Sequence, residues 1–232
     1  MATVILLRHA RSSANGAGIL AGRAPKVSLD DQGRRQADAL VQRLERIPLA
    51  DVVTSPLLRC KQTLAPLLKA REMTSSTDRQ LSEVDYGDWT GKEIKKLLKE
   101  PLWRVVQAHP SAAVFPGGEG LAAVQARAVA AIRAHDKRIT AEHGDDALWL
   151  ACSHGDVIKS VLADALGMHL DSFQRIVVDP CSVSVVRFTE TRPFVVRSND
   201  NGGDFSGLIP KSKRKRGRRR GSDAVVGGST GR

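Results

Sequence analysis

The sequence is poor in aromatic residues and in cysteine. Tryptophan, tyrosine and phenylalanine make up 4% of its 232 residues, so a core must be built mainly from alanine, valine and leucine. The three cysteines are Cys60, Cys152 and Cys181. Because they are odd in number, widely spaced and include no CxxC pair, they argue against a disulfide framework and a zinc site. They fit a reducing compartment, and we expect a cytoplasmic protein.

Long apolar runs are also missing. No stretch approaches the ~20 apolar residues that a membrane-spanning helix needs. The first apolar run covers residues 4–7 and stops at Arg8, which is too short for a secretory signal. With 41% hydrophobic and 26% charged residues, the composition is ordinary for a soluble globular protein. We therefore expect a soluble chain that makes no membrane contact.

The net charge of +11 is concentrated near the C-terminus. Residues 205–232 hold nine basic residues and one aspartate, so this segment carries +8 and the rest of the chain only +3. Apolar residues are scarce there, and such a segment cannot bury enough surface to offset the entropy cost of ordering. We expect a folded catalytic domain over residues 1–204 and a disordered, basic tail over 205–232.

The basic tail is a candidate for binding polyanions. Lys211–Arg220 holds eight basic residues and no acidic one, and such a run can bind nucleic acid through release of counterions. No aromatic residue that could stack on bases is interleaved with it. Any contact should therefore be non-specific, and a solvated tail is our default interpretation.

Strand-like and helix-like patterns alternate along the rest of the chain. Strands are predicted at about 3–7, 51–55 and 147–152, and a closing hairpin at 182–188 and 194–198. Helices are predicted after the possible cap Ser28 and over about 56–69, 92–99, 119–142 and 155–166, whereas 101–118 looks irregular. This alternation predicts a single α/β domain of three layers, α/β/α, with a mostly parallel sheet.

Reactive side chains occur where the predicted strands end. Arg8 and His9 end the first strand, Arg59 lies just past the second, and His154 follows the strand at 147–152. Ligands bind beyond the carboxyl ends of strands in open α/β sheets. Two arginines and two histidines suit a tetrahedral dianion, because guanidinium groups bind two oxygens at once. A neutral imidazole can attack phosphorus, and a second imidazolium can stabilise the oxygens.

Five segments also carry a family resemblance. They are Leu6–Ala10 with Asn15, Ser55–Thr63, Leu81–Glu83 with Gly87–Gly91, Pro116–Glu119, and Ser153–Lys159. In this order they resemble the motifs of the histidine phosphatase superfamily, the phosphoglycerate-mutase-like family. One motif alone would be a weak signal, but five in register between about residues 3 and 198 are specific.

The resemblance implies a role for each residue. His9 would form the phosphohistidine, and Glu83 would protonate the leaving alkoxide and then activate water. A raised pKa is expected of such an acid. No metal or other cofactor is implied, because arginine and histidine supply the positive charge. The residues that would bind the phosphoryl oxygens are Arg8, Asn15, Arg59, His154 and Gly155.

Two residues directly after His9 depart from the family pattern. Ala10 stands where glycine is usual, and it adds a methyl group and restricts the backbone. Arg11 stands where glutamate is frequent, and the reversed charge at the mouth of the site could favour a more anionic substrate.

Simpler interpretations stand beside these roles. Asn15 could merely shape a turn with Gly16, and Glu83 could be one of many exposed loop glutamates. Gly117 and Gly118 could merely fix a loop before the next helix. Cys60 and Cys152, although close to the proposed site residues, are expected to be small buried side chains.

Three functions remain open. The first is hydrolysis of a small phosphorylated metabolite. The second is a phosphomutase, although the region after Gly91 lacks the paired arginines that resemblance to glycolytic mutases would require. The third is a catalytically weak protein that binds nucleic acid through its tail. The sequence determines neither the substrate nor the oligomeric state, and it is compatible with a homodimer formed through an edge strand or a helix face.

Overall fold

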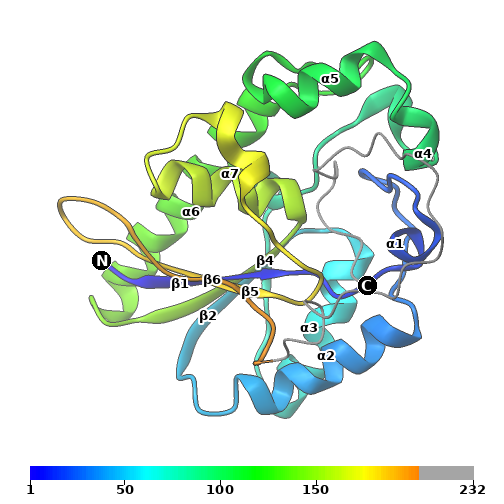
Figure 1. The fold of residues 1–232 in the computed structure, drawn as a ribbon. Helices are drawn as coiled ribbons and strands as arrows, with labels where there is room; N and C mark the ends of the chain where they lie inside the picture. Colours follow the sequence, from blue (N-terminus) through cyan, green and yellow to red (C-terminus); the bar gives the residue numbers. More distant parts are fainter. Residues whose placement is uncertain (204–232) are drawn as a thin grey trace.

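A single sheet organises the protein (Figure 1). The structure, a computed structural model, describes residues 1–203. Within this part six strands have the order β3-β2-β4-β1-β5-β6. Their bounds are β1 (Thr3–Arg8), β2 (Leu49–Thr54), β3 (Ser76–Thr77), β4 (Leu148–Ser153), β5 (Val183–Arg187) and β6 (Phe194–Asp200). The predicted tail over 205–232 lies outside the described residues.

The sheet is mostly parallel, as predicted. β1 pairs in parallel with β4, and β2 pairs in parallel with both β4 and β3. β5 pairs antiparallel with β1 on one side and with β6 on the other, so β5 and β6 form the expected closing hairpin. The carboxyl ends of β1, β2 and β4 therefore meet at one edge of the sheet.

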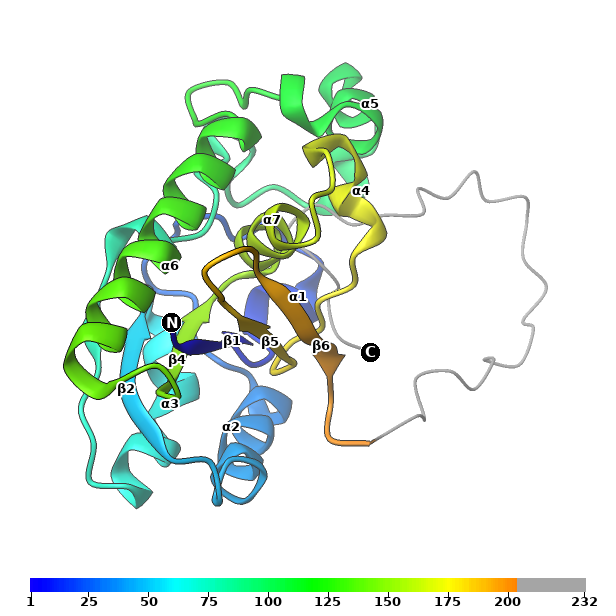
Figure 2. The ribbon, with the colours of Figure 1, turned by 90° about the vertical axis from the view of Figure 1, so that its left-hand side faces the viewer.

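Helices cover both faces of the sheet, as Figures 1 and 2 show. Helices α2 (Asp31–Arg43) and α3 (Leu58–Ala70) pack on one face, and α6 (Leu121–His143) and α7 (Gly155–Ala165) on the other. Along β1, Val4 and Leu6 belong to the core under α6 and α7, whereas Ile5 and Leu7 belong to the core under α2 and α3. A strand buried on both faces needs this continuous apolar run. The three-layer α/β/α prediction is confirmed.

Shorter elements complete the described part. They are α1 (Ser13–Ala17), α4 (Ile94–Leu97), α5 (Pro101–Ala108) and the 3-10 helices η1 (Arg79–Leu81), η2 (Gly87–Trp89), η3 (Pro110–Ala112) and η4 (Leu170–Arg175). No helix in residues 1–203 is long and apolar enough to cross a membrane.

Two local predictions were wrong. Residues 101–118 are not irregular throughout, because α5 occupies their first part and buries Trp103 and Val106. Proline is tolerated at the first position of a helix, where Pro101 lies, because the N–H it lacks is not needed there. The helix was missed because its two turns give too short an apolar pattern to detect. Helix α2 is capped by Asp30 rather than Ser28, since the Asp30 side chain accepts a hydrogen bond from the Gly33 amide.

Helix α2 touches the backbone that follows β1 at a glycine. A Cβ atom on Gly33 would lie 1.9 Å from the carbonyl oxygen of Arg11. The same carbonyl accepts a hydrogen bond from the Asp30 amide at 3.2 Å, and the Arg11 amide donates to Gln36 Oε1 at 2.9 Å. The first turns of α2 thus hold the segment that follows His9.

This contact predicts that alanine in place of Gly33 will destabilise the protein, although alanine usually stabilises a helix relative to glycine. Gly33→Ala should destabilise the protein by about 2 kcal/mol or more, because the backbone of Arg11 must move, although alanine ordinarily stabilises a helix by about 1 kcal/mol over glycine. Urea unfolding measures the change. Gly16→Ala is the control, because its Cβ would meet side-chain ends and no backbone, with Arg11 Nη2 at 3.2 Å and Asp30 Oδ2 at 3.3 Å. Equal stability of Gly33→Ala and the parent would contradict the packing.

Candidate active site

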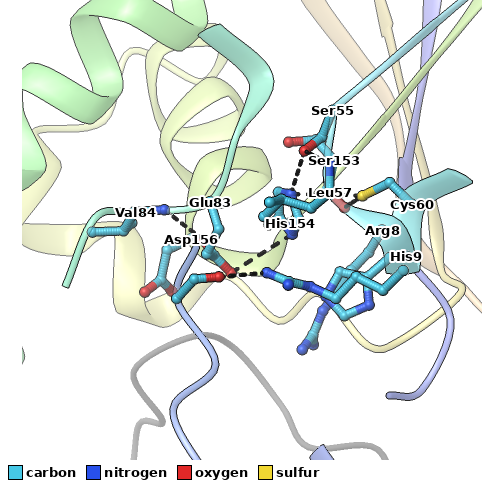
Figure 3. Close-up of polar contacts among 12 residues, drawn as sticks. Arg8, His9, Ser55, Leu57, Cys60, Glu83, Val84, Ser153, His154 and Asp156 are labelled. Atoms are coloured by element: carbon cyan, nitrogen blue, oxygen red, sulfur yellow. Dashed lines mark hydrogen bonds and ion pairs between the residues drawn. The ribbon is translucent and has the colours of Figure 1, made fainter. Parts of the chain in front are cut away.

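Four of the predicted site residues converge at the carboxyl ends of the central strands, and Figure 3 labels three of them, Arg8, His9 and His154. Arg8 ends β1 and pairs in register with Ser153, the last residue of β4. His9 and His154 follow directly, and their ring centroids are 5.2 Å apart. Arg59 reaches them from the first turn of α3, and its Nε lies 3.2 Å from His9 Nε2.

Hydrogen bonds fix the tautomer of His9. Its Nδ1 lies 2.7 Å from the carbonyl oxygen of Ala10. A carbonyl oxygen only accepts, so Nδ1 carries the proton and the lone pair is on Nε2. Burial, together with the charges of Arg59 and Arg8, holds the pKa of His9 well below its usual range. The imidazole is therefore neutral, and Nε2 can act as a nucleophile.

Two buried arginines flank this imidazole. Arg8 is 0% and Arg59 1% exposed. Arg8 donates to the carbonyl oxygen of Val178 at 2.7 Å, and Arg59 Nη2 donates to that of Gly22 at 2.8 Å. Arg59 Nη1 is buried with no hydrogen-bond partner among residues 1–203. An unsatisfied charged donor is costly, and an anion beside His9 would remove that cost.

His154 is oriented by Ser55, which sequence reasoning missed as a site residue. The Ser55 hydroxyl lies 2.7 Å from His154 Nε2 and also accepts from the Leu57 amide at 3.4 Å. When the hydroxyl donates to Nε2, the proton of a neutral His154 ring lies on Nδ1, which is buried with no hydrogen-bond partner within the described chain.

The surroundings of His154 set its protonation state. Burial and the charge of Arg59 hold the pKa of His154 well below its usual range. The ring is therefore neutral, and with its proton on Nδ1 it can donate a hydrogen bond from that atom. A bound dianion would favour the protonated form.

Glu83 is also in the site and is not an exposed loop residue. It is 4% exposed, its Oε1 accepts from the Val84 amide at 3.0 Å, and its Oε2 lies 3.9 Å from His154 Nδ1. Burial and the negative charge of Asp156 raise the pKa of Glu83 to about 7. Near neutral pH this carboxyl can give or take a proton.

The backbone of Glu83 is held by a charged network that sequence reasoning also missed. Its carbonyl oxygen accepts from Arg23 Nε at 2.9 Å and from Arg127 Nη2 at 3.3 Å. Both arginines also contact Glu119 Oε1 at 2.7 Å, and this oxygen accepts from the Asp85 amide at 2.8 Å. Glu119, the last residue of the Pro-Gly-Gly-Glu segment, thus helps to fix the Glu83 loop. The Pro116–Glu119 segment was recognised in the sequence, but its spacing did not indicate this contact with the Glu83 loop.

Asn15 and Gly155 are placed less directly. Asn15 Oδ1 accepts from the amide and the hydroxyl of Ser12, at 3.0 and 2.8 Å, within the capping box of α1. The simpler interpretation of Asn15 as a shaping residue therefore has structural support. Gly155 begins α7 directly after His154, where amide groups lack acceptors within the helix.

The two unusual residues after His9 have structural partners. Ala10 is fully buried, and its amide donates to Thr63 Oγ1 at 2.8 Å. Arg11 forms an ion pair with Asp30, with 2.9 Å between Nη1 and Oδ2. The charge reversal expected at the mouth of the site is thus partly offset by the start of α2. Among residues 1–203, no group of three or more histidine, cysteine and acidic side chains could hold a metal ion.

Comparisons with known proteins agree with this geometry. A family model described as "Histidine phosphatase superfamily (branch 1)" matches residues 4–201. "Phosphoserine phosphatase 1" of Hydrogenobacter thermophilus is 29% identical over 202 residues, covering 86% of this chain and 92% of that protein. "Probable phosphoglycerate mutase GpmB" of Yersinia pestis is 28% identical over 193 residues, covering 82% and 87%. The crystal structure of an alpha-ribazole phosphatase from Shigella flexneri superimposes with a TM-score of 0.73, 25% identity and 85% and 96% coverage.

The unpaired Arg59 donor predicts that inorganic phosphate stabilises the protein. Unfolding should become harder by about 2.7 kcal/mol at a phosphate concentration 100 times Kd. Arg59→Met should lose this stabilisation, whereas Arg11→Met, which lacks a cation that is already paired with Asp30, should keep it. Melting curves at constant ionic strength, with chloride in place of phosphate, provide the measurement. An unchanged phosphate response in Arg59→Met would contradict the assignment of the anion site.

Proposed function

Because the chain belongs to the histidine phosphatase superfamily, we propose that it hydrolyses a small phosphomonoester through a phosphohistidine on His9. One observation carries the proposal. His9 is a neutral imidazole whose Nε2 lone pair lies beside a buried arginine with an unsatisfied donor. A nucleophile and a dianion-binding group at this separation are what attack on a phosphomonoester requires.

The first step transfers the phosphoryl group to the protein. The substrate oxygens bind Arg59 Nη1, Arg8, the Nδ1–H of His154 and the amide of Gly155, with Asn15 at the edge. His9 Nε2 attacks phosphorus, and the bond from phosphorus to the ester oxygen breaks. The carboxyl of Glu83 gives its proton to that oxygen, so the alcohol leaves uncharged.

The second step returns the protein to its starting state. The Glu83 carboxylate takes a proton from water, whose oxygen attacks phosphorus as the bond to His9 Nε2 breaks. Inorganic phosphate leaves, His9 is neutral again, and Glu83 is protonated again. The same side chain can do both because its pKa of about 7 lies near the working pH.

A phosphomutase would share the first step but return the phosphoryl group to the bound alcohol. Relatives named as a phosphatase and as a mutase match at nearly equal identity, 29% and 28%. We favour hydrolysis, and product analysis separates the two, since a mutase yields an isomer without free phosphate. Phosphoserine and α-ribazole phosphate, taken from the names of two relatives, are the first substrates to test.

The domain bounds, the cellular location, the basic segment and the oligomeric state complete the proposal. We propose that the catalytic domain covers residues 1–204 and acts in the cytoplasm, where the free and buried cysteines Cys60, Cys152 and Cys181 would stay reduced. Lys211–Arg220, outside the described residues, would contact polyanions without specificity. A homodimer stays compatible with the fold.

Replacing the nucleophile tests the proposal. His9→Ala should lower phosphate release from p-nitrophenyl phosphate and from phosphoserine by about 10³-fold or more, because the variant lacks the nucleophile of the proposed mechanism. His143→Ala, an exposed histidine at the end of α6, is the control and should retain full activity. A fully active His9→Ala protein would exclude the mechanism.

The raised pKa of Glu83 predicts a pH profile. For an alkyl phosphate, kcat/KM should fall as pH rises through about 7, since the deprotonated carboxyl cannot protonate an alkoxide. Glu83→Gln should lower kcat/KM by about 10²-fold or more and lose this dependence. The kcat/KM for p-nitrophenyl phosphate should change less, because its leaving group needs no proton. Equal losses for both esters would assign Glu83 another role.

A further inference from the structure

A second buried carboxylate, Asp156, lies at the site and takes no part in the steps above. It is in the first turn of α7, two residues after His154, and is 0% exposed. The hydroxyl of Tyr86 donates to its Oδ2 at 2.7 Å, and Lys159 Nζ lies 3.6 Å from its Oδ1. Burying a charge is costly unless it is paired and hydrogen-bonded, and Tyr86 and Lys159 supply the hydrogen bond and the paired charge that this buried carboxylate requires.

Tyr86 connects this carboxylate to the Glu83 loop. It lies three residues after Glu83 and is itself 0% exposed, with its ring packed edge-on against Phe115 at 4.9 Å. Its bond to Asp156 therefore ties the Glu83 loop to the helix that begins beyond His154. In the view of Figure 3, Asp156 lies on the side of Glu83 away from His9.

Lys159 is the buried counterion of Asp156. It is 4% exposed, and its Nζ donates to Gln174 Oε1 at 3.0 Å and lies 5.5 Å from the centroid of the Phe173 ring. It follows Asp156 by three residues, so both side chains lie on one side of α7. Tyr86 joins Asp156 to the Glu83 loop, and Asp156 is the member of the pair whose charge raises the pKa of Glu83.

Charged groups face Glu83 from every element packed around it. The cations are Arg59 from α3 and Arg8 from β1, whereas His154 is neutral because its pKa is lowered by burial and by Arg59. Arg23 and Arg127 contact the Glu83 carbonyl, and their charges are offset by Glu119 and Asp85. Asp156, Lys159 and Tyr86 complete the set. Arg59 and Arg8 together favour the ionised form of Glu83. An ionised Glu83 could not protonate a leaving group.

We propose that Asp156 is a positioning residue for the acid: its fixed negative charge, placed behind Glu83 by Tyr86 and moderated by Lys159, keeps Glu83 protonated against the pull of Arg59 and Arg8. This inference rests on the proposed function in assigning Glu83 as the acid. Like charges that share a site raise the proton affinity of one partner, and the effect of Asp156 on the pKa of Glu83 has this sign.

Substitutions at Asp156 and at Lys159 should shift the pH dependence of kcat/KM in opposite directions. Asp156→Asn keeps the shape and an acceptor for Tyr86 but removes the charge. The alkaline limb of kcat/KM for an alkyl phosphate should then move to lower pH by about one unit, a tenfold loss at pH 8 that disappears at low pH. Lys159→Met removes the moderating cation and should move the limb to higher pH. The kcat/KM for p-nitrophenyl phosphate should respond less in both variants.

A merely structural role would lower the rate equally at all pH values. Such a uniform loss, an unmoved limb, or shifts of the same sign in both variants would overturn the proposal. If Asp156→Asn does not fold, the direction of the shift in Lys159→Met decides.

A second measurement does not depend on turnover. ¹³C-NMR titration of protein labelled at the glutamate carboxyl, with Glu83 assigned through Glu83→Gln, reports the protonation of Glu83 directly. The midpoint should fall in Asp156→Asn and rise in Lys159→Met, and an unchanged midpoint in either would overturn the proposal. If the parent protein releases no phosphate from any ester, the proposed function fails, whereas this titration still tests the Asp156–Glu83 coupling.

Discussion

The parallel pairing of β1 with β4 is the constraint on which the site depends. Arg8 pairs with Ser153, and the His9 amide donates to the Ser153 carbonyl at 2.9 Å, so the two strands end level with each other. His9 and His154 each follow the last residue of their strand, and their ring centroids therefore lie 5.2 Å apart. Side chains alternate between the faces of a sheet, so a slip of one residue would reverse every contact. Apolar cores on both faces prevent that slip.

The second constraint is the balance of buried charge. Arg8 and Arg59 are both almost fully buried beside His9, and an Arg59 donor has no partner in the described chain. Leaving this donor unsatisfied costs stability, and an anion bound beside His9 would remove that cost. Burial and the same cations hold the pKa of His9 well below its usual range, so the imidazole is neutral and can act as a nucleophile. The effect of these cations on Glu83 is opposed by burial and by Asp156. In the proposed mechanism the pair of arginines binds the anion, and Asp156 tunes the acid.

Much of this could be predicted from the sequence, for physical reasons. Buried parallel strands leave continuous apolar runs, and His9, Arg59 and His154 stand directly after such runs or at the start of the next helix. The fold class and the convergence of these residues follow from that pattern and from the order of the motifs. Glu83 was found through its motif, but its burial could not be read from a polar loop sequence.

Contacts between distant loops could not be predicted. Ser55 reaches His154 across 99 positions, and Arg23 reaches Glu119 across 96, and no local spacing encodes either contact. Asp156 could be read only as an acidic residue in a helix's first turn, which is usually a solvated position. Helix α5 was missed because it has only two turns, and Asn15 has a capping contact that competes with the ligand role its motif suggested.

The most direct test of the central claim is to locate the phosphoryl group during turnover. The protein is mixed briefly with p-nitrophenyl [³²P]phosphate, quenched in alkali to preserve phosphohistidine, digested and mapped by mass spectrometry. The account predicts one labelled peptide per chain, containing His9, with phosphorus on Nε2. Label on any other residue, or hydrolysis of the ester without labelled protein, would contradict it.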